Sequence, residues 1–146
     1  MKKIITLFLC GLSATAFAEQ FLVSVDEMKA SNSAKPSFTA KSVPVKDAPL
    51  IELAAPKLSA PVSSPTIIEL KFKSAAPSTV KPESFRVLYG SFEIDITKRI
   101  LSLTKVTETG VFVQEASLPK GKHKLLMVVE DSSGRRGNRV VEFEVN

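Results

Sequence analysis

The stretch TIIELKFK, residues 66–73, alternates apolar and charged side chains along most of its length. Ile68, Leu70 and Phe72 fall on one side of an extended chain, and the charged residues between them fall on the other. Successive side chains of a strand point to opposite faces, so this period of two predicts a β-strand with one buried face.

Four further stretches carry strand patterns. Alternate positions are apolar in SFRVLYG (84–90), in RVVEFEVN (139–146) and, more weakly, in GVFVQEASL (110–118). The stretch KHKLLMVVED (122–131) is apolar on both faces after Lys124, which is typical of a central strand. The side chains expected to face the core are Phe85, Val87, Tyr89, Val141, Phe143 and Val145, with either Val111 and Val113 or Phe112 and Ala116 from residues 110–118.

Turn signals separate these stretches. Pro119-Lys120-Gly121 predicts a tight turn, and Asp131-Ser132-Ser133-Gly134 predicts a hairpin between the last two strands. A short strand at 92–94 and one or two helical turns within 94–106 are expected to cross to the next strand. The pattern predicts an all-β fold over residues 49–146: an immunoglobulin-like antiparallel β-sandwich of about seven strands with a short helical crossover.

The first residues are typical of an export signal. Lys2 and Lys3 precede an apolar run, and Ala16-Phe17-Ala18 forms a small-x-small cleavage site. Residues 1–18 are therefore expected to be a signal peptide, and the mature chain is expected to begin at Glu19 in the periplasm or outside the cell. Cys10 leaves with the signal, so the mature chain would use neither a disulfide nor a thiolate. The apolar run is too short to span a bilayer core of about 30 Å.

Residues 19–48 are expected to form a mostly disordered tether. Proline, alanine, serine and lysine dominate from Ser31 to Ser64, a composition that buries too little surface to offset the cost of ordering. A strand at 21–25 and a helical turn at 26–30 are each too short to stand alone, so these residues are expected to form at most an ordered tip of the tether. The segment PLIEL (49–53) is read either as the first strand of the domain or as a docking segment.

The last sixty residues carry a resemblance. Pro82–Val87, Asp95–Thr97, Leu118–Leu125 and the hairpin Asp131–Arg135 resemble the bacterial immunoglobulin-like or fibronectin type III-like sandwiches of exported proteins. The resemblance covers about Ile51 to Val145. It implies the fold but no single function, because such sandwiches serve as spacers, adhesion units and binding modules.

A second resemblance concerns a metal carrier. SAPVSSPTIIELKF (59–72) and the final VEFEV (141–145) are similar to the frame of the periplasmic copper-resistance C type carriers. That family's copper ligands include a histidine near the mature N-terminus and another in the final turn. Here the mature chain would begin Glu19-Gln20, and the final turn carries Arg135 and Arg136, so no copper ligands are carried over.

His123 is the only histidine, and a metal ligand or a general base are its functional interpretations. Metal sites of this kind assemble several nitrogen or sulfur ligands, and the mature chain offers no second histidine and no cysteine. A base needs an orienting partner and a nearby nucleophile, and the neighbouring sequence contains neither. His123 is therefore expected to pack its ring at the rim of the sandwich.

Two acidic groupings are likewise expected to be structural. A calcium loop needs about 6–8 oxygen ligands, and the turn beginning at Asp131 offers only the adjacent Glu130 before two arginines. Glu93 and Asp95 lie at alternate positions, an arrangement open to a pair of glycosidase carboxylates, but short loops leave no place for a cleft. We expect no metal, no cofactor and no enzymatic activity.

Apolar residues opposite the core mark a candidate contact face. Leu88, Leu126, Val128 and Val140 are expected to point away from the sandwich interior. They predict either a docking surface for a protein or for a second copy, or a face covered by the tether or the crossover.

The sequence therefore predicts an exported, non-enzymatic sandwich module with a binding or spacing role in the cell envelope. The alternative is a small-ligand or copper carrier whose site is lost or displaced. The 20 basic and 15 acidic side chains are interleaved and tryptophan is absent, so nucleic acid is not an expected partner.

Overall fold

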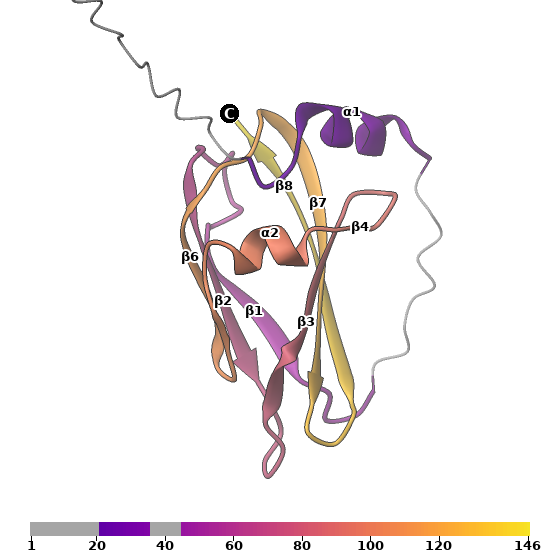
Figure 1. Cartoon of the computed structure of the whole chain (residues 1–146), viewed down its shortest axis with the longest axis vertical. Coiled ribbons are helices and arrows are strands. Elements are labelled where there is room, and N and C mark those ends of the chain that lie inside the picture. Colours follow the sequence, from indigo (N-terminus) through magenta and orange to yellow (C-terminus); the bar gives the residue numbers. More distant parts are fainter. Residues whose placement is uncertain (1–20, 36–44) are drawn as a thin grey trace, which may run out of the picture.

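The computed structural model describes residues 21–35 and 45–146, which form an antiparallel β-sandwich of two four-stranded sheets (Figure 1). The elements are α1 (Val25–Ser33), β1 (Leu50–Ala55), β2 (Thr66–Lys73), β3 (Val80–Tyr89), β4 (Ile94–Asp95), α2 (Thr97–Leu101), β5 (Val106–Thr107), β6 (Gly110–Ala116), β7 (Gly121–Asp131) and β8 (Arg136–Val145). The prediction of an all-β sandwich is confirmed. The described residues form eight strands rather than about seven, and two of them, β4 and β5, are only two residues long.

The strand order places β7 inside its sheet. One sheet has the order β1-β2-β6-β5, and the other has the order β4-β3-β7-β8. All ten residue pairs from Gly121↔Val145 to Glu130↔Arg136 align β7 with β8 without a shift. The prediction of a central strand from its two apolar faces is therefore confirmed.

The core lies between the two sheets and follows the predicted alternation. Phe85, Val87 and Tyr89 of β3 are each 1% exposed, and Val141 and Val145 of β8 are also buried. In β6 the buried residues are Val111, Val113 and Ala116, which combines the two alternative registers. The reason is a register shift in the β2–β6 pairing between Thr66 and Ile68, where the alternation slips by one residue.

The crossover begins later than predicted. The chain turns at residues 90–93, where Glu93 has φ of 50°, so the short strand forms at Ile94–Asp95 rather than at 92–94. The Thr97 backbone N–H donates to Asp95 Oδ1 at 2.9 Å, and the Thr97 hydroxyl accepts from the Val87 N–H at 2.9 Å. These bonds fix the short helix α2 to β3.

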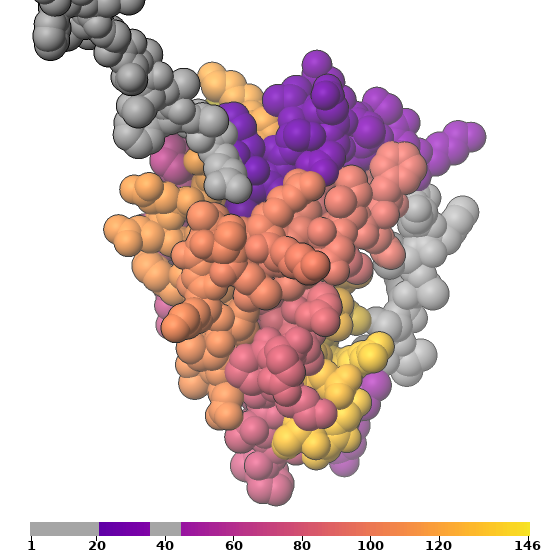
Figure 2. All heavy atoms as spheres, in the orientation of Figure 1, coloured from indigo at the N-terminus to yellow at the C-terminus, as the bar shows by residue number. Residues whose placement is uncertain are grey.

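Residues 21–35 differ from the predicted tether, because they are ordered and pack on the sandwich. Ser24 and Glu27 form a reciprocal capping box at the start of α1. Leu22 and Val23, just before the helix, are 4% and 0% exposed. Figure 2 shows this segment lying directly on the chain around α2. Burial of two aliphatic side chains contributes about 1.5–3 kcal/mol each, which offsets the ordering cost that composition alone predicts.

The segment 49–53 is resolved in favour of a strand, since β1 pairs with β2 from Leu50↔Lys73 onward. The proposed signal peptide (1–18) lies outside the described residues, as does the part of the tether from 36 to 44. Within the described ranges, neither helix has the length and apolar character needed to cross a bilayer.

Candidate protein-binding face

The predicted contact residues share the outer face of the sheet β4-β3-β7-β8. Leu88 of β3 is paired with Leu126 of β7, and Leu126 is paired with Val140 of β8. The three side chains therefore form one row across three strands. Val140 is 47% exposed, and Leu88, Leu126 and Val128 are partly exposed. Val128 lies one row further along β7, so the structure brings all four together.

Charged side chains flank this apolar row at both ends. On one side Lys124 is paired with Glu142, and their side chains form an ion pair at 3.5 Å. On the other side Val128 is paired with Arg86 of β3. The next rows outward hold the cross-strand pairs Lys122↔Glu144 at one end and Glu130↔Arg136 at the other. The face thus has an apolar middle and charged ends, which is the usual make-up of a protein contact surface.

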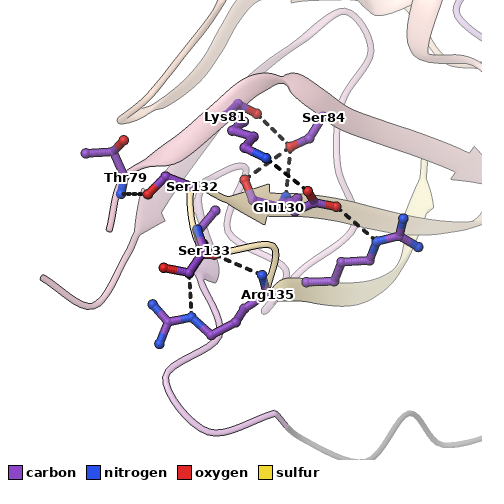
Figure 3. A network of polar contacts seen from close by, with 9 residues as sticks. Thr79, Lys81, Ser84, Glu130, Ser132, Ser133 and Arg135 are labelled. Atoms are coloured by element: carbon purple, nitrogen blue, oxygen red, sulfur yellow. Dashed lines mark hydrogen bonds and ion pairs between the residues drawn. The ribbon is translucent and has the colours of Figure 1, made fainter. Parts of the chain in front are cut away.

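Glu130 anchors one charged end through a polar network that Figure 3 shows around Lys81 and Ser84. Its carboxylate accepts from Lys81 Nζ at 3.2 Å and from Arg136 Nε at 3.3 Å. These two hydrogen bonds lower the pKa of Glu130 below its ordinary value. Its backbone N–H donates to the Ser84 hydroxyl at 2.8 Å, which fills the register shift between β3 and β7. Glu130 is therefore a fixed negative charge.

The acidic turn is a hairpin held by Asp131. This carboxylate is 0% exposed and accepts from the backbone N–H groups of Ser133 and Arg135 at 3.0 and 2.9 Å, and from Arg135 Nε at 2.8 Å. Burial by itself raises the pKa of Asp131, but the hydrogen bonds and the charge of Arg135 lower it overall. Both oxygens serve the turn, and within the described residues no group of three or more His, Cys, Asp and Glu side chains is placed to hold a metal.

His123 is an interior residue, 3% exposed, with both ring nitrogens engaged. Nε2 lies 2.7 Å from the Pro119 carbonyl oxygen, which can only accept, so Nε2 carries the proton. Nδ1 lies 2.9 Å from the Tyr89 hydroxyl and accepts from it. The ring stacks on Phe143 at a centroid distance of 5.5 Å. Burial lowers the pKa of His123, partly opposed by the Pro119 hydrogen bond, so the ring is held neutral.

Asp95 has a structural role as well. Its carboxylate accepts from the backbone N–H of Thr97, the first residue of the short helix α2. Hydrogen bonds from Thr97 lower the pKa of Asp95. Glu93, two residues earlier, is an exposed residue of the turn with positive φ. The two carboxylates that suggested glycosidase chemistry thus lie in a turn and in the short strand β4 just before α2.

Side chains in or next to the strands donate hydrogen bonds to carbonyl groups near the sheet edges. Arg86 Nη1 donates to the carbonyls of Glu83 and Phe85, at 3.1 and 2.8 Å. The Thr104 hydroxyl donates to the Phe112 carbonyl at 2.6 Å. Arg139 Nη1 donates to the Ile51 carbonyl at 3.1 Å. Such contacts occupy groups that an added strand would need, and they favour contact through a face rather than an edge.

A hollow of about 750 Å³ adjoins the candidate face. Val128 of the candidate face and Asn138 are among the residues that line it, together with Pro49, Leu50 and Lys73. A second hollow, of about 470 Å³, lies at the other end of the face between the end of α1 and the strands β7 and β8. The face is therefore bounded by a depression at each end.

Sequence reasoning missed other exposed apolar side chains. Phe112 is 52% exposed on the opposite sheet, and Phe92 is 62% exposed in the turn before β4. One of the two registers expected for residues 110–118 placed Phe112 in the core. In the structure Phe112 is exposed between the buried Val111 and Val113, so its side chain points to solvent. These residues provide matched control positions away from the candidate face.

None of the protein-family models compared with the chain matches it, and the comparison with curated proteins likewise found no significant match.

Proposed function

We propose that the chain is an exported, non-enzymatic, immunoglobulin-like module that binds a protein in the periplasm or cell envelope. The binding surface is the outer face of β3, β7 and β8. The main support for this proposal is the continuous row Leu88–Leu126–Val140, with Val128 beside it, on a sheet face flanked by charges. Apolar side chains gathered on one exposed face indicate an interaction surface more strongly than single exposed residues do.

The state of the polar side chains supports a binding role over catalysis. His123 uses both ring nitrogens in hydrogen bonds to Tyr89 and Pro119, and the Asp131 carboxylate is occupied by the hairpin. Each of these groups is paired in a way that stabilises the fold. A general base instead needs a free nitrogen or oxygen facing a substrate.

The location rests on the N-terminal pattern of Lys2, Lys3 and Ala16-Phe17-Ala18. Expression in a bacterium with the native N-terminus tests it by mass spectrometry of the periplasmic fraction. A mature chain beginning at Glu19 supports export, and a full-length chain retained in the cytoplasm contradicts it.

Binding through the face is tested by site-specific photo-crosslinking in the producing cell. A photoreactive residue at Leu126 or Val140 is expected to give discrete protein adducts, whereas one at Phe112 on the opposite sheet is not. Both Val140 and Phe112 are about half exposed, so reactivity alone does not separate them. Equal adducts at the two positions, or none at Leu126 and Val140, would refute the proposed face.

A further inference from the structure

We propose that the protein bound by this face is a second copy of the same chain, in a two-fold symmetric dimer. This inference rests on the proposed binding face and names its occupant. The argument is that the charge pattern of the face is complementary to itself when one copy is turned end to end against the other.

The pattern along β7 has opposite signs at its two ends. Lys122 and Lys124 lie before Leu126, and Glu130 lies after it, with Val128 between. All of these alternate residues point outward, because His123, Met127 and Val129 between them are buried. Lys122 and Glu130 are each four residues from Leu126, so they lie at equal distances on either side of the apolar row.

The pattern along β8 is reversed. Arg136 lies four residues before Val140, and Glu144 lies four residues after it. Since β8 is antiparallel to β7, the basic end of β7 lies beside the acidic end of β8, as the pairs Lys122↔Glu144 and Glu130↔Arg136 show. Each end of the face therefore carries both signs of charge, whereas each strand is basic at one end and acidic at the other.

A two-fold axis along the row Leu88–Leu126–Val140 aligns these patterns. Rotation about it lays β7 antiparallel on β7 of the other copy, and β8 on β8. Lys122 of one copy then lies opposite Glu130 of the other, and Arg136 lies opposite Glu144. The symmetry repeats each contact, so four opposite-charge contacts surround the apolar rows. Lys122, Glu144 and Arg136 are exposed. Arg136 also keeps its ion pair with Glu130 of its own chain, so its guanidinium would lie between that carboxylate and Glu144 of the second copy.

The apolar row supplies the centre of the interface. Leu126 and Val140 would lie against the same residues of the second copy, which removes apolar surface from water on both chains. Aligned sheets pack at about 30° to one another, and the long lysine, arginine and glutamate side chains accommodate the displacement that this angle causes at the ends.

Sedimentation of the full exported chain over a wide range of concentration tests the dimer. The wild-type chain is expected to sediment as a dimer that dissociates on dilution, and Leu126→Asp is expected to sediment as a monomer. If Leu126→Asp loses its cooperative melting transition, Val140→Glu at the more exposed position replaces it. A wild-type chain that remains monomeric at every concentration would overturn the proposal.

Charge reversal tests the proposed two-fold arrangement specifically. The double variant Lys122→Glu/Arg136→Glu places like charges at all four contacts, as does Glu130→Lys/Glu144→Lys. Each is expected to associate about tenfold or more weakly by itself. Mixed together, the two variants restore opposite charges at every contact, so a mixed dimer of near wild-type affinity is expected. Lys71→Glu, on the outer face of the other sheet, is the matched control and should leave association unchanged.

Failure of the mixed pair to associate better than either variant alone would overturn the two-fold arrangement. The mass of the photo-crosslinked adduct at Leu126 separates this inference from the proposed function. Twice the chain mass supports the second copy. An adduct whose mass shows a different protein would support the binding face but overturn the dimer.

Discussion

The Tyr89 hydroxyl and Nδ1 of His123 lie 2.9 Å apart inside the sandwich, and neither side chain is more than 3% exposed. The two residues are 34 positions apart in the chain and lie on the neighbouring strands β3 and β7. Together with the contact of Nε2 with the Pro119 carbonyl, this hydrogen bond gives both ring nitrogens of the single histidine a partner within the fold. The burial of the two side chains makes the stability of the fold dependent on pH in two separate ranges.

His123 should destabilise the protein as the solution becomes acidic. Burial lowers the pKa of His123 in the folded state, so the unfolded chain takes up a proton more readily. The stability is therefore complete above the ordinary histidine pKa of about 6.5 and is lost as the pH falls below it. Urea unfolding at several pH values measures this. His123→Phe is expected to remove the dependence in this range, and an unchanged dependence in that variant would contradict the assignment.

Tyr89 should report on the alkaline range. Burial, together with the nearby charge of Glu27, raises the pKa of Tyr89 to about 12. The unfolded chain ionises near 10, so stability is complete below 10 and is lost as the pH rises toward 12. Tyr89 is the only tyrosine, so the ultraviolet absorbance of tyrosinate follows this group alone. Titration near 10 in the folded protein would contradict its burial.

The same hydrogen bond has a mutational test. Tyr89→Phe removes the donor and leaves the buried Nδ1 of His123 unsatisfied. The expected loss is about 1–3 kcal/mol in the free energy of unfolding. Chemical denaturation measures it, and the double variant with His123→Phe should lose less than the sum of the two single losses.

The ion pair between Glu27 and Arg99 should fix the N-terminal segment to the sandwich. Arg99 Nη1 and Nη2 donate to the two Glu27 oxygens at 2.8 and 2.7 Å, and Arg99 Nη1 also donates to the Leu22 carbonyl at 3.0 Å. Glu27→Gln is expected to cost about 1 kcal/mol, because the pair is partly exposed to solvent. Hydrogen exchange should accelerate in α1 while the exchange of β7 changes little.

Asp26→Asn is the matched control for this segment, since Asp26 also lies in the first turn of α1 but outside the ion pair. The hydrogen bonds from Arg99 are the main cause that lowers the pKa of Glu27 to about 2. The contribution of Glu27 is therefore complete above its ordinary value near 4.5 and is lost as the pH falls toward 2. Slow exchange of α1 in Glu27→Gln would show that the ion pair does not hold the segment.

Two glycines of the last hairpin should respond differently to alanine. A Cβ at Gly137 would overlap the backbone carbonyl of Pro49, so Gly137→Ala is expected to cost about 2 kcal/mol or more. Gly134 has open space around it but a φ of 78°, so Gly134→Ala is expected to cost about 1 kcal/mol from backbone strain alone. Thermal and chemical denaturation compare them. A larger loss at Gly134 would contradict the close approach of β8 to the start of β1.

The candidate site was only partly predictable. Leu88, Leu126, Val128 and Val140 were identified from local alternation, because the side-chain direction along a strand depends only on sequence parity. These residues line up in one row only because of the register between β3, β7 and β8, and that register could not be read from the sequence. The opposite charges at equal distances from Leu126 and Val140 likewise became meaningful only once the two strands were aligned.

Local patterning predicted the long strands β2, β3, β7 and β8, the residues of β2, β3 and β8 that face the core, and the turn at Asp131–Gly134, because these follow from local geometry. The short strand β4 begins later than predicted, and β5 was not predicted. Packing between distant segments, in contrast, places residues 21–35 on the sandwich, joins His123 to Tyr89 and brings four apolar residues onto one face. Those outcomes depend on surface buried and hydrogen bonds made between segments far apart in the chain, such as Ser31 with Ser91 and Arg99 with Leu22. Neither composition nor periodicity contains that information, because both describe only neighbours along the chain.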